Sequence, residues 1–87
     1  MADGRCAVPR FFFDLRDNAQ VDRDDEGLEF ESIEKARDEA ARSLAEIAKF
    51  VLPGVDVREL TMEVRDDAER PLFRTMLRYE YQAQPPE

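Results

Sequence analysis

The chain has 87 residues, with 21 acidic and 13 basic side chains, a formal net charge of -8 and no histidine. This length suits one small domain and excludes a catalytic domain joined to a regulatory one. The acidic balance disfavours binding to nucleic acid or to an anionic membrane surface, and the lack of histidine removes the commonest acid–base catalyst and zinc ligand.

Cys6 is the only cysteine, so the chain cannot form an internal disulfide. A lone thiol is typical of a reducing cytoplasm, and the N-terminus lacks the apolar stretch of a signal peptide. We therefore expect a cytoplasmic protein that does not cross a membrane. We also expect a mobile leader over residues 1–7, a single domain over residues 8–81 and a mobile tail over residues 82–87.

The first expected strand covers residues 8–16, where side chains alternate between two faces. Its apolar face carries Phe11, Phe13 and Leu15. Its other face carries Arg10, Phe12, Asp14 and Arg16. On that outward face we expect Asp14 to form a cross-strand ion pair beside the arginines. Residues 17–20 supply turn chemistry, and a short strand over residues 20–23 completes a hairpin.

A helix is predicted from about Ile33 to Leu52, with Ser32 as its N-cap and Pro53-Gly54 at its end. Leu28 and Phe30 are expected to tie the preceding connection to the core. Apolar residues recur at helical spacing and form one stripe. The stripe consists of Ile33, Ala36, Ala40, Leu44, Ile47, Ala48 and Val51.

A second hairpin follows the helix. Leu60, Met62 and Val64 alternate with polar residues in a strand over residues 59–65, and a loop over residues 66–70 leads into a strand over residues 71–81. The order β-β-α-β-β predicts an α+β fold, with a four-stranded antiparallel sheet in the order 2-1-3-4 and the helix packed on one face.

One helix leaves the other face of such a sheet open, and we take that face as the candidate interaction surface. It carries Arg10, Phe12, Arg16, Leu72, Arg74, Met76 and Arg78. Aromatic, methionine and arginine side chains are enriched at protein interfaces, which favours a homodimer or a partner surface. The alternative is a stacking platform for single-stranded nucleic acid. The negative net charge disfavours this alternative. The same charge would suit a basic protein partner.

The segment Asp22-x-Asp24-x-Glu26-Gly27 is similar to the start of a calcium-binding loop. That pattern needs a glutamate at its twelfth position, where this chain has Ile33, and an apolar residue at its eighth, where it has Glu29. We interpret the segment as a solvated acidic turn. No nucleophile, base and orienting group can be named together. We therefore expect no catalytic residues, cofactor or metal site, and a non-enzymatic role.

The segment from Pro9 to Asp17, the acidic turn ending in Gly27-Leu28-Glu29-Phe30, and an alanine-rich helix together carry a resemblance. They resemble an uncharacterised family of short proteins from rhizobia and related alphaproteobacteria, whose members typically carry Pro-Arg-Tyr-Phe-Phe in this first segment. Glu34, Ala36, Glu39 and Ala40 match its helix pattern, and the resemblance spans about Pro9 to Arg78; Phe11 stands where tyrosine is common. It implies a fold and an origin but no catalytic residues. By topology alone, the plan is also similar to small antitoxin domains.

Overall fold

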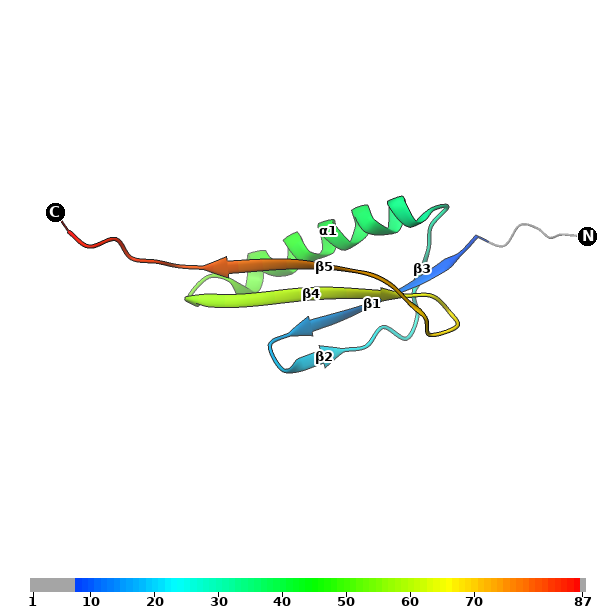
Figure 1. The fold of residues 1–87 in the computed structure, drawn as a ribbon, viewed down its shortest axis with the longest axis horizontal. Helices are drawn as coiled ribbons and strands as arrows, with labels where there is room; N and C mark the ends of the chain where they lie inside the picture. Colours follow the sequence, from blue (N-terminus) through cyan, green and yellow to red (C-terminus); the bar gives the residue numbers. More distant parts are fainter. Residues whose placement is uncertain (1–7, 87) are drawn as a thin grey trace, which may run out of the picture.

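The computed structural model describes residues 8–86. The expected leader, with Cys6, lies outside them. The elements follow in the order β1 (Arg10–Asp17), β2 (Gln20–Asp22), β3 (Leu28–Glu29), α1 (Ile33–Val51), β4 (Val57–Arg65) and β5 (Pro71–Glu80), as shown in Figure 1. The division into a leader, a single domain and a tail stays a prediction.

The strands form one antiparallel sheet in the order β2-β1-β4-β5, with β3 paired to β1. The predicted α+β class and strand order are confirmed, since the predicted third and fourth strands are β4 and β5. The two-residue strand β3 is an addition, because its stretch was predicted as a plain connection. Leu28 lies opposite Phe11 on β1, yet it is 49% exposed, because it lies on the outermost strand.

β4 is the central strand, paired with β1 on one side and β5 on the other. Its alternating sequence turns Leu60, Met62 and Val64 toward the helix, and all three are buried. Phe11 joins the same core from β1. Phe30 packs against this core, and its ring centroid lies 6.2 Å from that of Phe11. The predicted core faces of these strands are confirmed.

The helix begins where predicted, because the Ser32 hydroxyl accepts a hydrogen bond from the backbone N–H of Lys35 at 3.2 Å. Ala36 and Ala40 are fully buried, and such small side chains let the helix approach the sheet closely. The prediction was wrong for Ile33, which is the first residue of the helix and is 42% exposed, since burial of the helix begins only at Ala36. Within residues 8–86, no helix combines the length and apolar character needed to cross a membrane.

The two outer edges of the sheet differ. β5 is ten residues long and pairs only with β4 in the described part of the chain. The opposite edge consists of β2 and β3, with three and two residues, separated by the acidic turn. Beyond β5 the chain continues away from the sheet toward the C-terminus (Figure 1). One long edge, with a register shift only at its start, therefore faces away from the rest of the domain.

Candidate functional site

Strand register shows which residues share the open face, because directly opposed residues in antiparallel strands point to the same side. One row across the sheet consists of Val21, Arg16, Thr61 and Met76. The next row consists of Asp14, Glu63 and Arg74. Val21 was missed from the sequence, because a three-residue strand is too short to display an alternating pattern.

Apolar side chains on this face are partly accessible. Met76 is 55% exposed, Val21 46% and Leu72 37%. Thr61, which lies in the same row as Met76 and Val21, is buried. The face therefore offers separate apolar side chains between charged ones.

The exposed arginines of this face are paired with acids. Arg16 and Arg74 both approach the carboxylate of Glu63, at 3.5 and 3.6 Å. Arg78 lies 3.0 Å from the carboxylate of Glu59. Exposed pairs of this kind contribute little stability. They do offset the positive charge, so the predicted arginines form a charge-balanced surface.

Phe12 points to the open face, but it is half-buried and does not form the bare platform that the nucleic-acid alternative requires. The guanidinium carbon of Arg65 lies 4.8 Å from the centre of its ring. A Cβ atom placed on Gly27 would lie 2.9 Å from the same ring, which puts the turn against Phe12. The chain's own Arg65 and acidic turn therefore occupy space that a stacked base would need.

Arg10 is fastened to the neighbouring edge of the sheet. Its guanidinium donates to the backbone carbonyl of Glu26 at 2.6 Å and to the carboxylate of Glu29 at 3.1 Å. It thus holds the end of the acidic turn and β3 against β1. Of the seven predicted surface residues, the structure brings Arg16, Arg74, Met76 and Arg78 together by register. Arg10 and Phe12 contact the turn, and Leu72 lies near the β4–β5 loop at the start of β5.

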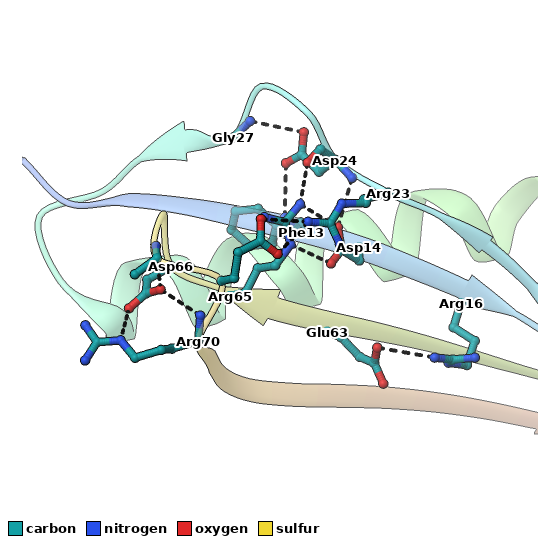
Figure 2. A network of polar contacts seen from close by, with 12 residues as sticks. Phe13, Asp14, Arg16, Arg23, Asp24, Gly27, Glu63, Arg65, Asp66 and Arg70 are labelled. Carbon is teal, nitrogen blue, oxygen red and sulfur yellow. Dashed lines mark hydrogen bonds and ion pairs between the residues drawn. The ribbon is translucent and has the colours of Figure 1, made fainter.

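Asp14 and Arg65 form a polar network beneath this turn (Figure 2). Asp14 lies on the open face as predicted. It is nevertheless only 9% exposed, because the turn and Arg65 cover it. Its carboxylate accepts from Arg65 Nε at 2.9 Å and from the backbone N–H of Asp24 at 2.9 Å. Burial acts to raise the pKa of Asp14, but these hydrogen bonds outweigh it and hold the pKa below its usual value. The predicted cross-strand ion pair exists, with Arg65 as the partner.

Asp24 organises the acidic turn. Between the pairs Leu15–Asp22 and Phe11–Leu28, three residues of β1 lie opposite five residues, 23–27, so this edge bulges outward. The Asp24 carboxylate accepts from the backbone N–H groups of Phe13, Glu26 and Gly27 at 3.0, 3.0 and 3.1 Å. These bonds lower its pKa although burial acts to raise it. Within residues 8–86, no cluster of side chains suited to a metal ion is found.

A hollow of about 560 Å³ lies on the open face near the β4–β5 loop. Arg23 crosses beside it to the carboxylate of Glu69 in that loop, at 2.6 Å. The charged lining consists of Arg23, Arg65, Arg74, Asp14, Glu63 and Glu69. Since three cations and three anions share this lining, its charge favours neither an anionic nor a cationic ligand.

Comparison with known proteins gives one match, to a protein family. No curated protein matches the chain. No solved structure matches it. The family model described as a domain of unknown function (DUF6894) matches residues 10–78, in agreement with the resemblance seen over about Pro9 to Arg78. That match covers most of the 87 residues, so the chain belongs to the DUF6894 family.

Proposed function

We propose that this chain is a non-enzymatic protein-interaction module that acts as a homodimer, joined through the open sheet face or an edge strand. The observation that carries this proposal is the arrangement of its layers: α1 covers one face of the sheet, while Met76 on the other face is 55% exposed. Small domains gain stability by burying such surface against a second copy. Aromatic, methionine and arginine side chains are also typical of protein interfaces.

The two most enclosed carboxyls support a structural role. General acid catalysis needs a carboxyl whose pKa is raised. Asp14 and Asp24 have lowered pKa values, after hydrogen bonds from Arg65 and from backbone N–H groups outweigh the effect of burial. Their oxygens accept hydrogen bonds from other residues of the same chain, as expected of a network that stabilises the fold.

The same geometry favours a protein partner over single-stranded nucleic acid. A phosphate backbone is bound by arginines that are free to pair with it. Arg16, Arg74 and Arg78 each lie within 3.6 Å of a carboxylate of β4. Phe12 already has Arg65 over its ring.

The setting of this function is part of the proposal. We propose the cytoplasm as its compartment, which rests on the single cysteine, Cys6. We propose an alphaproteobacterial source, which rests on the sequence resemblance. The net charge of -8 would suit a basic protein as any further partner.

The test is the mass of the full chain in solution. We expect light scattering after size-exclusion chromatography to give the mass of a dimer between about 1 and 100 µM. A monomer over that whole range would contradict the proposal.

A second measurement separates the nucleic-acid alternative. We expect no change in the fluorescence anisotropy of single-stranded RNA or DNA oligonucleotides at low salt. Binding that weakens with salt and with Arg74→Ala would favour the alternative, provided that Arg37→Ala, on the exposed side of α1, leaves it unchanged.

A further inference from the structure

We infer that a second copy of the chain binds along the outer edge of β5, antiparallel to it, with Leu77 opposite the partner's Leu77. This inference rests on the proposed homodimer and adds which edge is used and in which register. It predicts one continuous sheet through both copies, with both helices on the same face.

The length of β5 makes it the better template for pairing, because its one irregularity lies at its start, between Pro71 and Phe73. Its ten residues run from Pro71 to Glu80, and in the described part of the chain only β4 pairs with it. The backbone groups of alternate residues on an outer strand point outward and can bind another strand. The opposite edge is interrupted at residues 23–27, where Asp24 already binds the N–H of Phe13.

Symmetry restricts how two copies of β5 can pair. Antiparallel pairing of identical strands places a two-fold axis perpendicular to the sheet, midway between one residue of β5 and its own copy. We call this residue the residue on the axis. Each residue before that position then lies opposite the partner's residue at the same distance after it. Choosing the residue on the axis therefore fixes every pair in the interface.

Charge selects among the available registers. An axis at Met76 would place Arg74 opposite the partner's Arg78 twice, and like charges in that position are destabilising. An axis at Thr75 would place Arg74 opposite the partner's Met76, and no opposite charges would meet within the residues of β5. An axis at Leu77 places Arg74 opposite the partner's Glu80 twice, and Met76 opposite the partner's Arg78. An axis at Tyr79 would overlap the strands only over residues 78–80.

The face toward the helices also fits an axis at Leu77. This register places Thr75 opposite the partner's Tyr79, and Phe73 opposite the partner's Tyr81. Tyr81 lies just beyond β5 and is 57% exposed, although its backbone N–H still binds the carbonyl of Asp56 at 2.7 Å. Pairing would cover this ring with an aromatic neighbour from the other copy.

A charge exchange tests the pairing of Arg74 with the partner's Glu80. Six positions separate these residues on one strand, about 20 Å, so they do not meet within one chain. We expect Arg74→Glu and Glu80→Arg each to raise the dimer dissociation constant about tenfold or more, because each variant places like charges opposite each other. Mixing the two variants restores opposite charges at both contacts, and we expect the heterodimer to regain the native dissociation constant within about threefold.

Single cysteines identify the residue on the axis. In a Cys6→Ser background, we expect Leu77→Cys to form an intermolecular disulfide on mild oxidation, and Thr75→Cys and Met76→Cys to react much more slowly. In this register residue 76 and its copy are about 8 Å apart, which is too far for a disulfide. The charge exchange needs no change at the half-buried Leu77, so it stays decisive if that variant fails to fold.

The outcomes separate this inference from the proposed function. A dimer that crosslinks through position 75 or 76, or a mixture of the charge variants that stays dissociated, would overturn the register and leave the homodimer standing. A native chain that is monomeric at about 100 µM would remove both.

Discussion

The guanidinium of Arg65 meets the carboxylate of Asp14 at two points, with Nε 2.9 Å from Oδ2 and Nη2 3.3 Å from Oδ1. Arg65 ends β4 and Asp14 lies within β1, so this contact joins the hairpin that precedes α1 in the sequence to the hairpin that follows it. The same guanidinium also donates to the backbone carbonyl of Asp24 at 2.7 Å. One side chain therefore fastens the acidic turn to the centre of the sheet.

We predict that Asp14→Ala lowers the free energy of unfolding by about 2–4 kcal/mol, because it leaves a largely covered guanidinium without its carboxylate. The Arg65 side chain is only 12% exposed, so water replaces the lost partner poorly. Urea denaturation followed by circular dichroism measures the loss. The matched control is Glu29→Ala, which breaks the exposed pair with Arg10 and should cost less than about 1 kcal/mol. Similar losses in the two variants would contradict the special role of Asp14.

The faces of the long strands could be predicted because they depend only on local alternation. Leu60, Met62 and Val64 are buried in β4, and Leu72 and Met76 are exposed on β5, as their spacing predicts. Local pattern does not determine register between strands, however. Asp14 lies directly opposite Glu63 on β4, so its ion pair runs diagonally to Arg65, and its partner could not be predicted from β1 alone.

The cover over Phe12 escaped prediction for a related reason. The acidic residues and Gly27 indicate a turn, but they do not indicate where that turn lies. Its position follows from hydrogen bonds between the Asp24 side chain and the backbone of β1, at the gap between β2 and β3. The open face was therefore predicted correctly as a face, while the exposure of Phe12 and Asp14 was not.

We predict that Asp24→Ala loosens this turn without unfolding the sheet. The substitution removes the acceptor for the N–H groups of Phe13, Glu26 and Gly27. An unpaired backbone donor costs about 1–3 kcal/mol when it is shielded from water. Since all three donors lie in the turn or on the strand beside it, the stability is lost in this part of the fold. Hydrogen exchange should accelerate at the amides of Phe13 and Gly27. Asp25→Ala, at the exposed neighbouring position, serves as the control and should leave both rates unchanged.

We predict that Gly27→Ala is more harmful than Gly54→Ala. Both glycines have positive φ, +72° and +91°, where a side chain is strained. A Cβ on Gly27 would lie 2.9 Å from the carbonyl oxygen of Phe11 and 2.9 Å from the Phe12 ring, whereas nothing lies within 4 Å at Gly54. We expect Gly54→Ala to cost about 1 kcal/mol and Gly27→Ala about 1–3 kcal/mol more. Equal thermal midpoints would show that the turn moves freely away from Phe12.

We predict that the domain loses stability in acid through Asp14 and Asp24. Both have pKa values below their usual 3.8 in the folded chain, where Arg65 and backbone N–H groups outweigh burial. The unfolded chain therefore takes up protons first as the pH falls. The contribution is complete above about pH 5 and is lost as the pH falls through the folded-state pKa values, below about pH 4. Urea midpoints measured from pH 7 to pH 2.5 should show this decline for the native chain.

Asp14→Asn separates this effect from general acid unfolding. The variant lacks the Asp14 carboxyl, whose pKa is lowered in the folded chain, so we expect it to be less stable at pH 7 and to lose less stability between about pH 5 and pH 3 than the native chain. The two stability curves should converge toward low pH, because protonation removes from the native chain what the substitution has already removed. Parallel curves would mean that the Asp14 carboxylate contributes no pH-dependent stability, and that the contact with Arg65 is no stronger than an exposed ion pair.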